Sequence, residues 1–305
     1  MKTKTTSRYM QGIMWAMLAS TLWGISGTVM QFVSQNQAIP ADWFLSVRTL
    51  SAGVILLAIG AVQQGRGIFK VFRSWASVGQ LVAYATLGLM ANMYSFYVSI
   101  EKGTAAAATI LQYLSPLFIV LGTLAFKREL PLRTDMIAFG VSLLGVFLAI
   151  TRGNIHELAI PMDALVWGVL SGVTAALYVV LPRKIVAENS PVVILGWGTL
   201  IAGFLFNLYH PLWQGAPKVT PSLVLSIGAI VLIGTIFAFL SLLHSLQFAP
   251  SAVVSIVDAV QPVVTFILSI IFLGLKVSVV EIIGSVLVVF AIYILQRFRS
   301  DPSLD

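Results

Sequence analysis

The sequence predicts an all-α integral membrane protein in which ten helices cross the bilayer. Of the 305 residues, 58% are hydrophobic and only 10% are charged, and the mean hydropathy is +0.97. Soluble domains carry about 25% charged residues, so this chain has too few charges to cover a water-exposed surface. We therefore expect a multi-pass protein of the cell (plasma) membrane.

Ten apolar runs account for the predicted spans, because a helix needs about 20 apolar residues to cross the bilayer core. The gaps between them contain Pro and Gly, and none is long enough for a separate soluble domain. The first run is too long for a cleavable signal peptide and has no small-residue cleavage pattern behind it. The runs are 10–32, 42–62, 75–98, 103–126, 134–151, 162–182, 191–212, 221–246, 250–275 and 278–297.

Lys and Arg predict the orientation of the chain in the membrane. One set of gaps, which includes both termini, holds 13 of the 18 basic residues, the opposite set holds 4, and Arg48 alone falls inside a span. Basic residues favour the cytoplasmic side, so both termini are expected there. The net charge of +7 is spread over these gaps and not gathered on one face, which argues against a nucleic-acid partner.

An internal repeat divides the chain into two copies. RTLSAG (48–53) matches GTLIAG (198–203) at an offset of 150, and from the third span onward an offset of 146 pairs Gly88 with Gly234 and Pro116 with Pro262. Each copy has five spans, and an odd number means that the second copy enters the membrane from the opposite side. The expected units are therefore two inverted five-helix repeats, residues 1–152 and 153–305.

This layout resembles the drug/metabolite transporter superfamily with its paired EamA-type domains. The segment FKRELPLRTDMIAFGVSLLGV (126–146) is similar to the acidic turn of that family, whereas the second copy has Leu275 where the acid is expected. The resemblance covers nearly the whole chain and implies an exporter of amino acids, amines or other small metabolites. Its shorter motifs are Trp23-Gly24, Arg48 and Ser115-Pro116.

The stretch VDAVQPVVTF (257–266) places an acid, an amide and a proline inside an apolar run. A helical proline frees the carbonyl four residues earlier, which belongs to Asp258 for Pro262 and to Gln112 for Pro116. We therefore expect a helix kink at each proline. A lone ionisable group in a span is costly and usually faces a cavity or a partner. Asp258 is the candidate to carry a coupling proton or to bind a cationic solute, with Gln112 and Gln261 beside it.

A polar stripe extends this stretch along one helix face. It either lines a path between the two halves or packs closely against a neighbouring helix, since small and hydroxyl residues favour such packing in membranes. Its members are Ser251, Ser255, Asp258, Pro262, Thr265 and Ser269.

Several other residues are weaker candidates for the same cavity. Arg48 is expected to pair with Asp258, to be held by helix carbonyls or polar side chains, or to meet an anionic substrate. His244 is expected at the wet membrane interface. A small-residue face, Ser20, Gly24, Gly27 and Gln31, predicts close helix packing. The remaining cavity candidates, whose aromatic members are equally typical of interface anchors, are Trp23, Asn92, Tyr97, Tyr113, Tyr178 and Trp197.

The sequence argues against an enzyme. HELAI (156–160) has Ile160 in place of the second histidine of a zinc motif, and no glycine-rich phosphate loop or GxSxG turn is present. No metal or cofactor is therefore expected. The prediction is a secondary active transporter that works by alternating access, with a small-molecule substrate, a coupling ion such as a proton, and membrane lipid as its partners. A passive channel for a small solute is the alternative.

Overall fold

The computed structural model describes residues 2–128, 133–152, 154, 158–245, 247–249, 254, 257, 258 and 260–298, and its regular structure is entirely helical there. The first half contains α1 (Lys2–Gln31), η1 (Phe32–Asn36), α2 (Ala41–Gln64), η2 (Gly65–Arg73), α3 (Trp75–Ala83), η3 (Tyr84–Met90), α4 (Ala91–Lys102), α5 (Ala105–Gln112), α6 (Ser115–Lys127) and α7 (Arg133–Thr151). The second half contains α8 (Met162–Val180), α9 (Arg183–Glu188), α10 (Pro191–Tyr209), α11 (Pro221–Val231), η4 (Leu232–Phe237), α12 (Ala238–Ser245), α14 (Val260–Leu273) and α15 (Val279–Phe298).

These helices confirm the all-α membrane architecture. Within the described ranges, seven helical stretches are long and apolar enough to cross a membrane. Three further predicted runs form shorter apolar helices, Met136–Thr151, Val260–Leu273 and Val279–Ile294. Among the residues singled out in the sequence, Ser251, Ser255 and the zinc-like His156 and Glu157 lie outside the described residues, as does Glu129 of the acidic turn.

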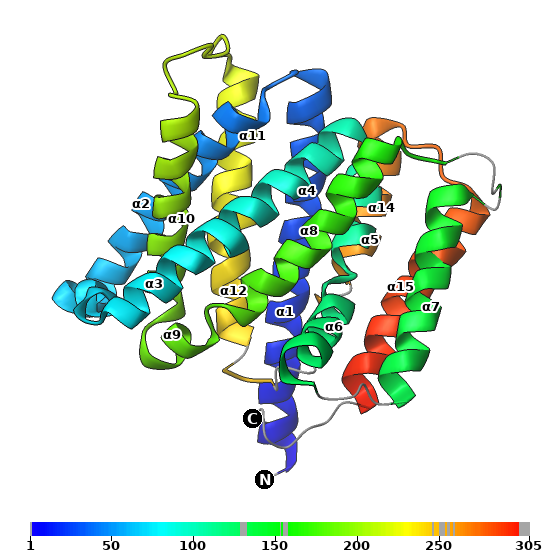
Figure 1. The fold of residues 1–305 in the computed structure, drawn as a ribbon, viewed down its shortest axis with the longest axis horizontal. Helices are drawn as coiled ribbons and strands as arrows, with labels where there is room; N and C mark the ends of the chain where they lie inside the picture. Colours follow the sequence, from blue (N-terminus) through cyan, green and yellow to red (C-terminus); the bar gives the residue numbers. More distant parts are fainter. Residues whose placement is uncertain are drawn as a thin grey trace.

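The two halves pack against each other in a reciprocal pattern (Figure 1). The second helices of the two halves, α2 and α10, pack against each other, and so do the last helices, α7 and α15. The first helix of one half packs on the third span of the other, which gives α1 with α12 and α8 with α4. In Figure 1, α1 rises from the N-terminus whereas α8 descends towards α9. The first helices of the two halves therefore run in opposite directions.

Glycine contacts repeat this relationship at the level of single residues. A Cβ atom on Gly53 would lie 2.7 Å from the backbone nitrogen of Leu200, and one on Gly203 would lie 2.8 Å from that of Leu50. Both pairs are related by the sequence offset of 150. Such close backbone approach requires glycine, and it is a common way for membrane helices to associate.

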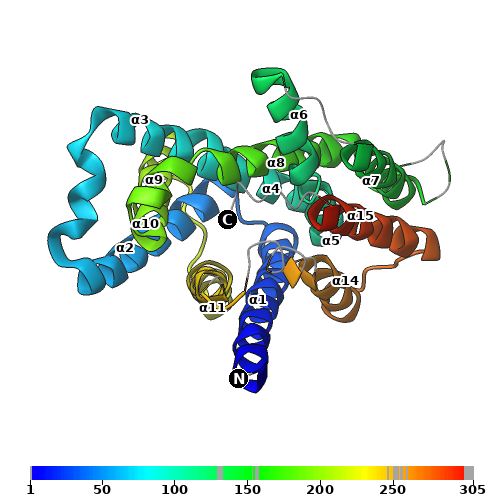
Figure 2. The ribbon, with the colours of Figure 1, turned by 90° about the horizontal axis from the view of Figure 1, so that it is seen from below.

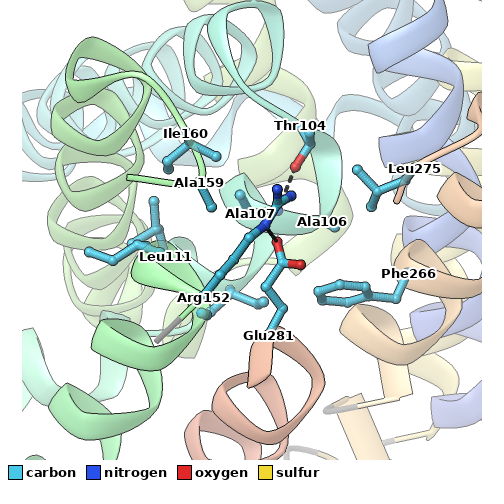
Figure 3. Close-up of a pocket in the computed structure, with 13 residues that line it drawn as sticks. Thr104, Ala106, Ala107, Leu111, Arg152, Ala159, Ile160, Phe266, Leu275 and Glu281 are labelled. Atoms are coloured by element: carbon cyan, nitrogen blue, oxygen red, sulfur yellow. Dashed lines mark hydrogen bonds and ion pairs between the residues drawn. The ribbon is translucent and has the colours of Figure 1, made fainter. Parts of the chain in front are cut away.

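The α7–α15 pair is the closest backbone contact of this kind. A Cβ on Gly145 would lie 2.6 Å from the carbonyl oxygen of Gly284, and one on Gly284 would lie 2.5 Å from that of Gly145. One end of the same pair carries an ion pair between Arg152 and Glu281, with Nε 3.0 Å from Oε1 (Figure 3). Glu281 also accepts a 2.6 Å hydrogen bond from the Ser278 N–H, as in a capping box at the start of α15. These contacts hold the two terminal helices of the halves together.

Helix irregularities occur at related places in the two halves. The π-helical segments η3 and η4 contain Gly88 and Gly234, the pair matched by the offset of 146. The fourth span is interrupted at Tyr113 and Leu114, and α6 then starts at Ser115, one residue before Pro116, where a kink is expected. Pro262 lies in the first turn of α14. Because Ala259 lies outside the described residues, the kink at Pro262 stays a prediction.

Candidate functional site

A cavity of about 430 Å³ lies between the halves. Its walls come from α1, α2, η3, α4, α5 and α6 of the first half and from α8, α12, α14 and α15 of the second. Eight of the ten predicted binding residues line it, together with Pro116. They are Trp23, Arg48, Asn92, Gln112, Tyr113, Tyr178, Asp258 and Gln261. The sequence did not single out several others that also line it, among them Ser26, Met30, Phe96 and Phe239.

Asp258, which belongs to the second half, is held by two residues of the first half. Ser20 of α1 donates a 2.9 Å hydrogen bond to Oδ1 of the carboxylate. The Tyr113 hydroxyl donates to the Asp258 carbonyl oxygen at 2.6 Å and also lies 3.4 Å from Oε1 of Gln261. The Asp258 carbonyl is the one that Pro262 cannot satisfy, so the tyrosine replaces the missing backbone donor.

Arg48 makes no ion pair within the described part of the chain. Its Nε donates to Oγ1 of Thr235 at 3.3 Å, and Nη1 approaches the sulfur of Met30 at 3.3 Å. Arg48 therefore does not pair with Asp258 as one of the three alternatives expected, and its role stays a prediction. Thr235 belongs to η4, so the contact joins α2 to the irregular turn of the eighth span.

The opposite wall of the cavity combines amides and aromatic rings. Asn92 donates from Nδ2 to the Ser171 carbonyl at 2.9 Å and lies 3.4 Å from Nε2 of Gln112, which connects α4, α5 and α8. Trp23 packs edge-on against Phe239, with ring centroids 5.4 Å apart, and Tyr178 lies 6.3 Å from the same Phe239 ring. The site can thus offer hydrogen bonds, an anionic group, a cationic group and aromatic surface.

Several candidates lie elsewhere. Tyr97 is fully buried and donates its hydroxyl hydrogen to the Ile39 carbonyl at 2.9 Å. Trp197 donates from Nε1 to the Ile68 carbonyl at 2.8 Å, away from the cavity. Thr265 and Ser269 of the polar stripe are fully buried and do not line the cavity, as expected for close helix packing.

His244 also lies away from the cavity. Its ring packs edge-on against Trp15 at a centroid distance of 4.9 Å. Of the small-residue face on α1, Gly24 fits the expectation of close packing, since a Cβ there would lie 2.7 Å from the Val264 side chain. Ser20 does more than pack, because its hydroxyl is a ligand of the Asp258 carboxylate.

Two glutamine side chains connect α1 and η1 to the facing ends of α4 and α5. Gln35 of η1 donates from Nε2 to the carbonyls of Ile100 at 2.9 Å and Gly103 at 2.7 Å, at the end of α4. Gln31 accepts a 2.8 Å hydrogen bond from the Ala105 N–H at the start of α5 and donates to Gln35 at 3.0 Å. Helix ends leave such backbone groups without intrahelical partners, and here α1 and η1 satisfy them.

The second, smaller cavity does not suit a substrate. Its volume is about 30 Å³, which is room for about one water molecule. Arg152, Glu281, Leu275 and Phe266 contribute to its walls (Figure 3). The ion pair that fastens α7 to α15 crosses it, so its role is structural.

Comparison with known proteins places the chain in a family. The sequence profile of the EamA-like transporter family matches residues 10–151 and 162–297. The chain is 28% identical over 285 residues to a protein of Salmonella typhimurium (strain LT2) described as the uncharacterized inner membrane transporter YicL, covering 93% of this chain and 95% of the relative. It is 27% identical over 207 residues to the Escherichia coli (strain K12) protein described as the uncharacterized inner membrane transporter YhbE, covering 66% and 63%.

A solved structure supports the same fold. A crystal structure of another protein superposes with a TM-score of 0.63 at 17% sequence identity, over 97% of this chain and 99% of that chain. At this identity the likeness concerns the fold alone, whereas the family profile covers both halves of the sequence. The chain therefore belongs to the EamA-like transporter family, and it is a multi-pass transporter of the plasma membrane and not an enzyme.

Proposed function

We propose that the protein is a secondary active transporter that exports small metabolites, such as amino acids or amines, by alternating access. One observation carries the proposal: Asp258 and Arg48 line the same cavity, and no ion pair joins them. Each charge is therefore available to a solute or a coupling ion. The volume of about 430 Å³ falls in the usual range for small-molecule sites, about 300–1,000 Å³.

In this proposal Asp258 is the coupling or cation-binding group. A carboxylate within a span is costly unless it serves a pathway, and here it is held by Ser20 and faces the cavity. Arg48 meets an anionic group of the solute, while Gln112, Gln261 and Asn92 provide hydrogen bonds. Trp23, Tyr113 and Tyr178 form the remaining wall. The proton is the simplest ion that a single carboxylate can carry.

Gradient-driven transport can be tested in proteoliposomes. A mixture of amino acids and amines is loaded on one side, a pH gradient is imposed, and the internal solutes are measured over time. Accumulation of one solute above its external concentration, abolished by a protonophore, supports the proposal. A passive channel only equalises the two concentrations, and that outcome would replace secondary transport by the alternative.

We further propose ten spans in two inverted repeats, residues 1–152 and 153–305, with both termini in the cytoplasm. The distribution of Lys and Arg, 13 against 4, supports this orientation. This orientation puts the contacts of Gln31 and Gln35 at the outer ends of α4 and α5. We propose that these contacts close the cavity towards the outside in this state.

Reporter fusions test this topology. Fusions at Gly67, Asn189 and the C-terminus should report the cytoplasm, whereas fusions at Gln37, Asn154 and Gly215 should report the outside. An activity assay of a reporter that folds only in one compartment gives the readout. A fusion on the wrong face at any of these six positions would break the ten-span arrangement.

The outer closure leads to a second prediction. The chain contains no cysteine, so Ser26→Cys introduces a single thiol into the cavity wall. Adding Gln35→Leu should raise the rate at which an external, membrane-impermeant maleimide labels this thiol by about tenfold, because hydrogen bonds worth about 1 kcal/mol each are lost. Labelling is followed by mass shift in intact cells.

A neighbouring glutamine provides the control for that experiment. Gln37 donates to Oγ of Ser222 at 2.8 Å and does not bind the α4 carbonyls. Gln37→Leu should therefore leave the labelling rate at the level of the parent. Equal acceleration by both substitutions, or by neither, would show that Gln35 does not close this end.

A further inference from the structure

The connection between α2 and α3 forms the 3₁₀ helix η2, Gly65–Arg73. A 3₁₀ helix has three residues per turn, so side chains three apart lie above one another. The sequence GRGIFKVFR therefore separates into three faces. One face carries Phe69 and Phe72, with Arg66 one turn before them. The second face carries Lys70 and Arg73, and the third carries Ile68 and Val71.

One of the three faces is fixed against the protein. Val71 is 1% exposed and packs in the core with Ile185 and Val192. The backbone carbonyl of Ile68 accepts the 2.8 Å hydrogen bond from Trp197 of α10. Because this face is held, the other two faces have a defined direction relative to the spans.

The apolar face is exposed. Phe69 is 54% exposed and Phe72 41%, although both rings pack against Trp197, with centroid distances of 5.7 Å and 4.9 Å. Trp75, which follows at the start of α3, is 89% exposed. Exposed aromatic side chains at the end of a membrane span are typical of the boundary between acyl chains and headgroups.

The basic face lies beside a second group of positive charges. Lys70 donates from Nζ to the Glu188 carbonyl at 2.9 Å, which brings η2 against α9. Helix α9 starts with Arg183 and Lys184, both exposed. Within the described residues, none of these cations and neither Arg66 nor Arg73 takes part in an ion pair. Glu188 is the single acidic residue in η2 and α9, so the surface keeps a positive surplus.

The position of η2 matches a membrane interface. It forms the end of the candidate span Ala41–Arg73, next to the start of the following one, Trp75–Lys102. Figure 2 shows the connection between α2 and α3 at the outer edge of the molecule. An amphipathic segment with aromatic and basic faces binds at the interface plane with its apolar side in the acyl region. Nearby Lys and Arg attract anionic lipids.

We propose that η2 is an anionic-phospholipid site. Arg66, Lys70 and Arg73, helped by Arg183 and Lys184, bind the phosphate headgroups of the leaflet, while Phe69, Phe72 and Trp75 insert among the acyl chains. The apolar face directly beside the basic one favours a lipid over a soluble anion, which would need only the charges. The inference depends on the membrane location of the chain and not on its substrate or transport mechanism.

Lipid selectivity of the purified full-length protein provides the test. The protein is reconstituted in phosphatidylcholine vesicles that contain a trace of spin-labelled phosphatidylglycerol or spin-labelled phosphatidylcholine, and the motionally restricted fraction of each label is measured. We expect the wild-type protein to prefer phosphatidylglycerol by about threefold or more. High salt should reduce this preference, because surface charges are screened.

A triple variant, Arg66→Gln, Lys70→Gln and Arg73→Gln, should lose most of that preference. The matched control, Arg133→Gln, Lys218→Gln and Lys276→Gln, removes the same charge from other exposed positions and should keep it. If the η2 triple variant does not fold, the single variants Arg66→Gln and Arg73→Gln test the proposal. Each should lose part of the preference for phosphatidylglycerol. Equal restriction of both lipids in the wild type, or equal loss in the η2 and control variants, would overturn the proposal.

Discussion

Replacing Asp258 with asparagine should abolish gradient-driven transport while the protein still folds and inserts. Asparagine keeps the shape of the side chain and can still accept the hydrogen bond from Ser20, but it cannot ionise. A group that carries a coupling proton must be able to ionise. Solute accumulation by the variant should therefore fall to near the level of empty liposomes. Solute exchange without a gradient is expected to persist if only coupling is lost. Proteoliposome assays of uphill accumulation and of exchange distinguish the two.

Two further variants serve as a conservative substitution and as a control for this result. Asp258→Glu keeps an ionisable group and should retain partial activity with a changed pH optimum. Asp163→Asn removes a carboxylate that is half exposed and paired with Lys102 outside the cavity, and it should transport at the normal rate. If Asp258→Asn accumulates solute like the wild type from mildly acidic to mildly alkaline pH, Asp258 is neither the coupling group nor a cation anchor.

Gly145→Val should destabilise the protein strongly. The new Cβ would lie 2.6 Å from the Gly284 carbonyl oxygen and 2.8 Å from the Val288 backbone nitrogen, so α7 and α15 must move apart. Overpacking costs typically 1–3 kcal/mol and sometimes more, and here it acts on backbone atoms that cannot rotate away. We expect the Tm of the detergent-purified protein to fall by about 5 °C or more, with less monodisperse protein recovered.

Gly140→Val is the matched control on the same helix. A Cβ at Gly140 has no atom within 4 Å among the described residues. Both substitutions place the same β-branched residue in a helix, so the difference between their Tm values isolates the contact with α15. Similar Tm values for the two variants would mean that the α7–α15 contact contributes little to stability.

The sequence predicted the helices and much of the cavity because these depend on strong local signals. Asp258 and Arg48 were recognisable as charges inside apolar runs, and both line the cavity. The carbonyl freed by Pro262 was predicted from local geometry, but its partner Tyr113 lies 145 residues away. No local sequence pattern predicts a contact between residues so far apart in the chain. The partner can be identified only when the two halves are packed together.

For other residues and segments, the sequence alone could not distinguish the observed role from more common ones. Ser20 belongs to a small-residue face that is typical of helix packing, and nothing in its surroundings indicates a carboxylate ligand. Tyr97 and Trp197 resemble Tyr178 in the sequence, yet they lie in the core and against η2. The faces of η2 repeat every three residues, so a search with the α-helical period treats that segment as an ordinary loop.

The paired irregular turns η3 and η4 also bear on the history of the gene. A π-helical turn amounts to one additional residue accommodated within an α-helix. Here it occurs around Gly88 in one half and around Gly234 in the other, at the matched positions. Two independent insertions at the same place are a less economical explanation than one insertion in an ancestral five-helix unit.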